Sequence, residues 1–329
     1  MKKQAIFFLV LIVLGLAVFS FYGSRDSVDQ TASDQAEKIA PLRVAWMTSW
    51  ATTGQVVEAL IHSDILERTN TSAEFRSFLF GPPINEAALA GDVDVAIFGD
   101  APAISLLARS PKWSVVSRTI YFPYALMVRS DIPATSVADL EGKTVGVPFG
   151  SGPQPTLYSW LKEAGLKIGE NVKIVNLLPN EMAEALKAKR VDAIMTWEPS
   201  ITLMEESGAA RVLKSAKGVG FMVMSDGYLA KHPKNAKNFL NAWKEALFYT
   251  VEHRTQTDEW FFKDSRLPVD LLGKLRVVDP NFSAQTLSQI DITLTEQDVK
   301  QNQAKADFMY AQGLIKEPIE IKSRLWKNN

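Results

Sequence analysis

The sequence predicts an α/β protein whose strands form a largely parallel sheet and whose chain folds into two lobes. Short apolar strands alternate with helical stretches, as they do in parallel α/β sheets. At residues 93–102 an apolar strand is followed by an acid and a proline, and this pattern recurs with one residue deleted at 191–199, which indicates similar lobes. Two further apolar strands, 124–129 and 218–224, are interpreted as hinge connections on which the lobes close over a ligand.

Four predicted strands are each followed by a loop that begins a helix. The strands are short, apolar-rich segments at residues 42–47, 73–80, 93–98 and 143–147. The loops that follow them are at residues 48–54, 81–83, 99–102 and 150–152. In such sheets, ligands bind at the carboxyl ends of strands, in the loops that start helices. The sequence therefore predicts a ligand site formed by these loops.

The loop Gly150-Ser-Gly152 lies between a β-branched strand and a helix predicted at residues 154–163. Pro153 stands near the first helical turn, which is a favoured place for proline. Outward-pointing backbone N–H groups and the helix dipole would make this loop an anion-binding nest. The alternative interpretation is an ordinary turn between a strand and a helix.

The C-terminal third is predicted to be mainly helical and to complete the first lobe. The longest helix is expected at residues 235–253, with an apolar stripe that contains Trp243. Further helical stretches are expected at residues 258–276 and 283–310. The predicted lobes comprise residues 42–126 with 222–329 for lobe 1, and residues 127–221 for lobe 2.

The N-terminal segment differs from the remainder of the chain. Lys2 and Lys3 precede an uninterrupted apolar run, so residues 1–22 are predicted to be a signal peptide or, alternatively, an uncleaved membrane anchor. The polar composition of residues 23–41 predicts a linker there. In both cases the remainder is expected outside the cytoplasm, in the periplasm or at the outer face of the cytoplasmic membrane.

The composition excludes several classes of function. The net charge is -1 and no run of Lys or Arg occurs, which argues against nucleic acid binding. The chain has no cysteine, which removes disulfides, thiolate metal sites and cysteine nucleophiles. Its three histidines are far apart and show no metal spacing. No cofactor, metal or catalytic residue is therefore predicted, and an enzyme, with Asp100 and Glu198 as its only candidate pair, is the less favoured class.

Several motifs together resemble the substrate-binding proteins of ABC importers for nitrate, aliphatic sulfonates and taurine. The similar segments, which span residues 42 to about 321 in the family's order, include Gly99-Asp-Ala-Pro102, residues 137–147, Gly150-Ser-Gly152, Ala164-Gly-Leu166, Trp197-Glu-Pro199 and Gly313-Leu-Ile315. The resemblance implies a type II periplasmic-binding-protein fold with a ligand cleft between the lobes. It also implies a permease and an ATPase as partners, a small solute as ligand, and a monomer.

The resemblance also implies which loop residues bind the ligand. Carried onto this sequence, they are Thr48, Ser49, Trp50, Gly81, Pro82, Gly99, Asp100, Ser151, Gly152, Gln154, Trp197 and Glu198. The residues themselves add Gly150 from its loop, Phe80 at a strand end and Tyr124 near the first connection. Trp50 and Trp197 are expected to cover the ligand, by stacking or by shape.

The two acids have alternative roles. Asp100 and Glu198 each precede or begin a helix, so each either caps its helix or accepts a hydrogen bond from a ligand amine or hydroxyl. Thr48, Ser49 and Ser151 can likewise donate to a ligand or satisfy the local backbone.

The sequence departs from the family's pattern at the fourth loop. Pro153 and Pro155 remove two N–H donors, and none of the implied loops contains Arg or Lys, so a fully ionic clamp for an anion is not evident. A neutral or heteroaromatic solute such as a pyrimidine is therefore an alternative ligand, and a membrane-tethered ligand sensor is an alternative role. Cytosolic relatives that synthesise a thiamine pyrimidine use a cysteine-rich motif, which this chain lacks.

Overall fold

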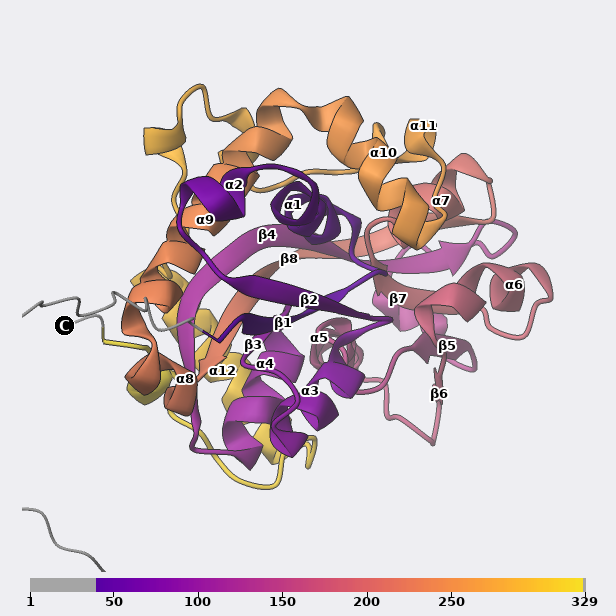
Figure 1. Ribbon diagram of the computed structural model, residues 1–329. Helices are drawn as coiled ribbons and strands as arrows, with labels where there is room; N and C mark the ends of the chain where they lie inside the picture. Colours follow the sequence, from indigo (N-terminus) through magenta and orange to yellow (C-terminus); the bar gives the residue numbers. More distant parts are fainter. Residues whose placement is uncertain (1–39, 328–329) are drawn as a thin grey trace, which may run out of the picture. The chain divides into compact units, whose positions relative to one another are not determined.

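The computed structural model describes residues 40–327, and these residues belong to one unit (Figure 1). The predicted signal peptide or anchor at residues 1–22, and nearly all of the linker at 23–41, lie outside the described residues. Within 40–327, no helix combines the length and the apolar character needed to cross a membrane.

A single sheet of eight strands runs through residues 40–327, in the order β2-β1-β3-β8-β4-β7-β5-β6. The strands β1, β2 and β3 pair in parallel, as do β5, β6 and β7. The long strands β4 and β8 pair with each other in antiparallel orientation and join these two groups. The strands are β1 (Leu42–Met47), β2 (Ala73–Phe78), β3 (Val95–Gly99), β4 (Trp113–Arg129), β5 (Thr144–Val147), β6 (Lys173–Asn176), β7 (Ala193–Trp197) and β8 (Ala210–Ser225).

The predicted parallel arrangement is confirmed for the two outer groups, and the two central strands, for which no orientation was predicted, are antiparallel. The predicted connections at residues 124–129 and 218–224 are parts of β4 and β8, which are both much longer than expected. The polar segment from Ser114 to Thr119 concealed the first half of β4. There the buried Arg118 is paired with Asp279, whose carboxylate lies 2.5 Å away, so a charged residue is accommodated in a central strand.

The two groups of parallel strands end close to each other. Strand β3 ends at Gly99, which pairs with Gly220 of β8, and β7 ends at Trp197, which pairs with Tyr124 of β4. Because β3 is antiparallel to β8, β8 to β4 and β4 to β7, the strands β3 and β7 point toward each other. Their carboxyl ends therefore meet beside the middle of the central pair, where Phe122 is paired with Gly218.

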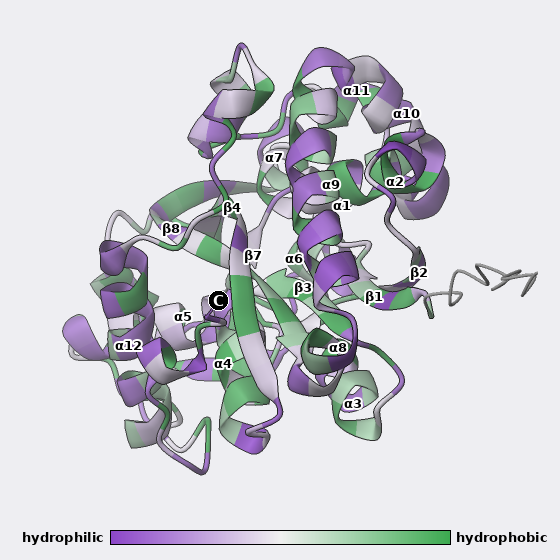
Figure 2. Ribbon diagram, turned by 60° about the vertical axis from the view of Figure 1, so that its left-hand side comes forward, coloured by the Kyte–Doolittle hydropathy of each residue, from purple (hydrophilic) through white to green (hydrophobic). Residues whose placement is uncertain are grey.

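Helices cover both faces of the sheet. The helices α1, α9 and α10 pack together on one side, whereas α4, α5 and α12 pack together on the other (Figures 1 and 2). Figure 2 shows hydrophobic residues concentrated in the strands between these layers. The helices are α1 (Ala51–His62), α2 (Ile65–Arg68), α3 (Gly81–Ala90), α4 (Asp100–Arg109), α5 (Pro153–Glu163), α6 (Met182–Lys187), α7 (Ser200–Glu206), α8 (Asp226–Lys231), α9 (Pro233–Glu252), α10 (Arg254–Ser265), α11 (Val269–Leu272) and α12 (Glu296–Ala311).

The end of α3 follows the sequence signals, but its beginning does not. Gly91 ends this helix with φ of 82°, a left-handed conformation that glycine adopts without a steric cost. The helix begins at Gly81, within the loop predicted at residues 81–83, because Pro82 and Pro83 are tolerated in the first turn, where an N–H has no helical partner.

The helical predictions for the C-terminal third are partly wrong. The stretch 258–276 is interrupted at Arg266, whose φ of 61° ends α10. In the stretch 283–310 only α12 is an α-helix, and it begins after Thr295, which forms a capping box with Asp298. Before it, Asn281 and Asp291 exchange two side chain–backbone hydrogen bonds of 2.8 and 2.9 Å, which compete with helix formation.

Candidate functional site

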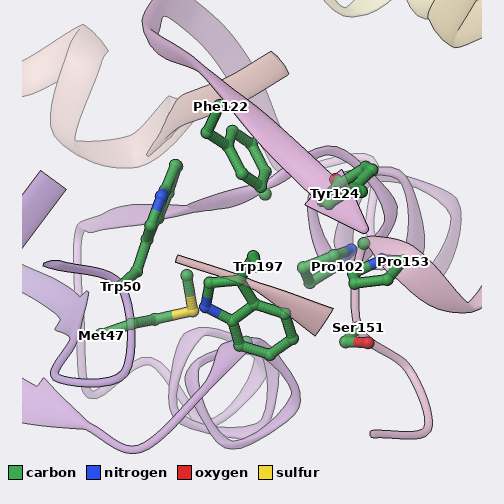
Figure 3. A pocket seen from close by; sticks show the side chains of 11 residues that line it. Met47, Trp50, Pro102, Phe122, Tyr124, Ser151, Pro153 and Trp197 are labelled. Carbon is green, nitrogen blue, oxygen red and sulfur yellow. The ribbon is translucent and has the colours of Figure 1, made fainter. Parts of the chain in front are cut away.

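A small cavity lies where β3 and β7 end beside the middle of β4 (Figure 3). Its walls come from the loop after β1, the starts of α3, α4 and α5, the middle of β4 and the end of β7. The space that the centre of a water molecule can reach is about 20 Å³, which is enough for about one water molecule. The lining residues are Met47, Trp50, Gly81, Gly99, Pro102, Phe122, Tyr124, Ser151, Gly152, Pro153 and Trp197.

The cavity walls are mainly aromatic and apolar. Trp50 and Phe122 lie 4.5 Å apart between ring centroids, and Phe122 meets Tyr124 edge-on at 4.8 Å. Figure 3 shows Met47 and Trp50 on one side, Tyr124, Pro102, Pro153 and Ser151 on the other, and Trp197 with Phe122 between them. None of the described residues that line the cavity is Lys, Arg or His.

The two indoles have different hydrogen-bonding states. Trp197 donates from Nε1 to the carbonyl oxygen of Ser49 at 2.9 Å, which ties the end of β7 to the loop after β1. Trp50 is 1% exposed, and its Nε1 has no partner. The hydroxyl of Ser49 is also buried without a partner. Because unpaired buried donors are energetically costly, both groups can stabilise an acceptor atom that reaches them.

Asp100 lies directly behind the cavity wall. The Asp100 carboxylate accepts hydrogen bonds from the Tyr124 hydroxyl at 2.6 Å and from the backbone N–H of Ala101 at 2.8 Å. Lys305, from α12, forms an ion pair with the other carboxylate oxygen. Burial and the neighbouring Asp100 raise the pKa of Tyr124 well above its ordinary value of 10, so its hydroxyl stays a donor.

Gly152 brings the start of α5 against this group. A Cβ at Gly152 would lie 2.2 Å from the Tyr124 hydroxyl oxygen and 2.9 Å from Asp100 Oδ1. The φ of Gly152 is −52°, so space rather than backbone conformation requires a glycine here. The start of α5 therefore packs closely against two residues from different elements, Asp100 at the start of α4 and Tyr124 on β4.

The Gly150 loop uses its polar groups internally. Gly150 has φ of 76°, and its N–H donates to the side-chain oxygen of Gln154 at 2.7 Å. The Ser151 hydroxyl donates to the carbonyl oxygen of Pro148 at 2.6 Å. These donors of the predicted nest are thus satisfied within the loop, and Gln154 lies outside the cavity lining.

Besides Gln154, the predicted residues outside the cavity lining are Ser49, Asp100 and Gly150, described above, and four others. The Thr48 hydroxyl donates to the carbonyl oxygen of Phe78 at 3.3 Å, and Phe80 packs half-buried against the core before α3. Pro82 lies against Gly150, where a Cβ would come within 2.8 Å of the proline ring.

Glu198 is the fourth of these residues, and it caps α7. Its carboxylate accepts hydrogen bonds from the N–H of Thr202 at 3.1 Å, from the Thr202 hydroxyl at 2.9 Å and from the N–H of Arg276 at 3.2 Å. Burial raises the pKa of Glu198, and the hydrogen bonds from Thr202 oppose this shift.

Seven of the predicted site residues line the cavity, and sequence reasoning missed several others. Met47 is the last residue of a predicted strand, and this position at the carboxyl end of the strand could have indicated that it lines the site. Phe122 was missed together with the first half of β4. Lys305 carries no signal in the sequence, because its partner Asp100 is 205 positions away. The predicted residues in the lining are Trp50, Gly81, Gly99, Tyr124, Ser151, Gly152 and Trp197.

Comparisons with known proteins agree on one group of proteins. The model of the family described as "NMT1/THI5 like" matches residues 84–257, more than half of the chain. A protein of Escherichia coli K12 that is named for binding aliphatic sulfonates is 27% identical over 258 residues, which cover 76% of this chain and 78% of that protein. The taurine-binding periplasmic protein of the same organism is 29% identical over 227 residues, which cover 66% of this chain and 68% of that protein.

Solved structures confirm the predicted periplasmic-binding-protein fold. The alkanesulfonate-binding protein SsuA of Xanthomonas axonopodis pv. citri, bound to MOPS, matches with a TM-score of 0.71 and 24% identity, over 87% of this chain and 98% of that chain. The desulfurization enzyme DSZB matches with a TM-score of 0.63 and 15% identity, over 88% of this chain and 96% of that chain. Because the same fold carries both a binding protein and an enzyme, the fold alone does not determine the function.

Proposed function

Because the chain belongs to the NMT1/THI5-like family, we propose that it is the solute-binding component of an ABC importer and binds a small organic sulfonate. The site is the cavity at the meeting carboxyl ends of β3 and β7. The observation that carries this proposal is that residues from both groups of parallel strands enclose that cavity. Ligand binding at this position is typical of α/β folds in which loops after strands meet.

The chemistry of the cavity suits a sulfonate with an organic tail. A sulfonate head offers only acceptor oxygens, and the unpaired Nε1 of Trp50, a residue of the cavity lining, is a donor that needs an acceptor. The unpaired hydroxyl of Ser49 belongs to the preceding residue and lies outside the lining. The rings of Phe122 and Trp197 provide an apolar surface for the tail. The sulfonate would thus be bound by neutral hydrogen-bond donors and by the shape of the cavity, and not by cationic side chains.

Binding requires the walls to separate. The cavity holds about one water molecule, so a ligand of several heavy atoms cannot enter it without movement. The register of the central strands shifts between Arg118 and Tyr121, beside the point where β3 and β7 end. We place the hinge there, so that the predicted lobes open and close about β4 and β8. The lobe boundaries given above remain predictions.

The mature protein acts outside the cytoplasm in this proposal, in the periplasm or at the outer face of the membrane. It delivers its solute, as a monomer, to a permease that is driven by an ATPase. Intact mass of the exported protein distinguishes a cleaved signal from an anchor. An intact N-terminus in the membrane fraction favours the anchor and the alternative role as a tethered sensor.

The aromatic walls favour one alternative class of ligand. Trp50, Phe122 and Trp197 can also enclose a flat, neutral heteroaromatic ring such as a pyrimidine. Such a ligand needs stacking surfaces and one acceptor, but no cation.

A titration tests these proposals together. Protein stripped of bound solute by unfolding and refolding is titrated with taurine, ethanesulfonate, butanesulfonate, nitrate and a neutral pyrimidine. Calorimetry and tryptophan fluorescence report binding, because Trp50 and Trp197 line the cavity. We expect saturable binding of at least one sulfonate, with a fluorescence change. Saturation by the pyrimidine alone would support the alternative ligand, and no response to any sulfonate would refute the proposed solute class.

A further inference from the structure

A buried carboxylate beside the cavity conflicts with an anionic ligand unless its charge is balanced. Asp100 is 2% exposed, and its Oδ1 lies within 2.9 Å of the Cβ position of Gly152, a residue of the cavity wall. Tyr124 and Gly152, two residues of the cavity lining, lie against this carboxylate. A negative charge at that depth would repel a sulfonate head, because water is excluded and screening is weak.

Lys305 supplies the balancing charge. Its Nζ pairs with Asp100 Oδ2 and lies 5.2 Å from the centre of the Tyr124 ring. The Lys305 side chain is 18% exposed, so the pair is largely shielded from water and salt. The Tyr124 hydroxyl donates to the other oxygen of the same carboxylate. The carboxylate is therefore satisfied on both oxygens, and the wall near Gly152 has no net charge.

We propose that Lys305 determines the charge specificity of the site. By pairing with Asp100, it makes the wall electrically neutral and thereby permits an anionic solute to bind. This inference rests on the proposed function and adds to it a residue on α12, far along the chain from the predicted loops. Lys305 acts through Asp100 and does not touch the solute.

Coulomb's law sets the expected size of the effect. A unit charge about 7 to 10 Å from the solute head, at an effective dielectric constant of about 20, changes binding roughly 10- to 50-fold. Loss of Lys305 should therefore weaken an anion by about this factor. A zwitterion with the same skeleton should lose less, because its ammonium group offsets the repulsion.

A purely structural role for Lys305 predicts a different pattern. If the ion pair only fastens α12 to α4, its loss weakens all ligands alike, and removal of the second charge does not restore binding. The sign and the ligand dependence of the change therefore separate the two roles.

The test compares three variants with the wild-type protein: Lys305→Met, Asp100→Asn, and the double variant. Calorimetry measures the Kd for ethanesulfonate and for taurine, which share a two-carbon skeleton but differ in net charge. We expect Lys305→Met to bind ethanesulfonate about 10- to 50-fold more weakly. Its fold-loss of affinity for taurine should be less than half as large. The double variant should return to within about threefold of wild type. Asp100→Asn, which leaves the cation unopposed, should bind ethanesulfonate more tightly.

Two controls make the result decisive. Lys300→Met removes an exposed lysine of the same helix and should leave both affinities unchanged. Thermal unfolding checks that each variant is folded, and if Lys305→Met is not, Asp100→Asn still tests the sign of the effect. Equal losses for both ligands without recovery in the double variant, or no gain in Asp100→Asn, would overturn the inference. Failure of the wild-type protein itself to bind any sulfonate is a different outcome from these changes in the variants, and it would overturn the proposed function as well.

Discussion

The starts of α4 and α7 come from similar sequences but use their acids differently. Each follows a buried strand, and each places an acid beside a proline, Asp100 near Pro102 and Glu198 before Pro199. Asp100 turns toward Tyr124 and Lys305, beside the cavity. Glu198 instead turns into its own helix and accepts hydrogen bonds from Thr202 and from the backbone of Arg276.

The partners of each acid, rather than the shared motif, therefore determine its role. A tyrosine on β4 and a lysine on α12 draw Asp100 into the wall of the cavity. The hydroxyl and N–H of Thr202, four residues along the chain, satisfy Glu198 locally. We therefore expect changes around Asp100 to act on ligand binding and changes at Glu198 to act on stability.

Gly152→Ala should produce the largest effect and tests the binding side of this comparison. The added Cβ would overlap the Tyr124 hydroxyl, so the start of α5 could not seat against the Asp100–Tyr124 pair. Overpacking of this kind costs about 1 to 3 kcal/mol, so affinity for the solute should fall about 5- to 150-fold. Calorimetry measures this loss.

Gly227→Ala is the matched control, because nothing lies within 4 Å of its added Cβ. It should bind the solute like the wild-type protein. Wild-type affinity in Gly152→Ala would show that the contact between α5 and this pair is irrelevant to binding.

Glu198→Ala should lower the free energy of unfolding by about 1 to 2 kcal/mol, because three hydrogen bonds at the start of α7 lose their acceptor. Affinity for the solute should stay within about threefold of wild type. Urea unfolding and calorimetry measure the two quantities. The control Glu205→Ala removes a partly exposed partner of Arg276 on the same helix and should cost at most about 1 kcal/mol. A large loss of affinity in Glu198→Ala would show that Glu198, like Asp100, acts on ligand binding.

The sequence predicts the outer strands and the loops of the site well, because their apolar runs and glycine–proline boundaries are local signals. It fails where distant partners override local pattern. The polar half of β4 is a strand because Arg118 is paired with Asp279, 161 positions away. Residues 284–294 contain no α-helix, because the Asn281 side chain binds both the carbonyl oxygen and the N–H of Asp291.

The same limit applies to the site. Trp50, Gly99 and Trp197 are found from strand ends, but no local pattern could show that Lys305 neutralises Asp100. Nor could it show that Gly150 donates to Gln154 rather than to a ligand.

Trp197→Phe should have a smaller effect on binding. The variant keeps an aromatic wall but loses the hydrogen bond to the carbonyl oxygen of Ser49, worth about 1 kcal/mol, so affinity should fall about fivefold. Fluorescence titration measures the change. Trp160→Phe alters a buried tryptophan outside the cavity lining and should leave affinity unchanged. Equal effects of the two changes would argue against a specific role for Trp197 in the site.

The smallest expected effect is a pH dependence of stability at Glu198. Because burial raises its pKa in the folded protein, the folded state binds more protons than the unfolded state at pH values above about 4.5. The contribution of Glu198 to the free energy of unfolding should therefore decline as the pH rises from the ordinary pKa of a glutamate through the raised pKa of the folded protein. Urea unfolding between pH 4 and 7 should show this decline in the wild-type protein relative to Glu198→Gln. Parallel stability curves for the two proteins would contradict it.

The most direct test of the central claim is a crystal structure with ethanesulfonate bound. We expect the sulfonate between the end of β3 and the end of β7, with an oxygen near Nε1 of Trp50 and the carbon chain against Phe122 and Trp197. We also expect the Asp100–Lys305 pair to stay intact behind Tyr124. A solute bound elsewhere on residues 40–327, with this cavity empty and the Trp197–Ser49 hydrogen bond unchanged, would contradict the proposal.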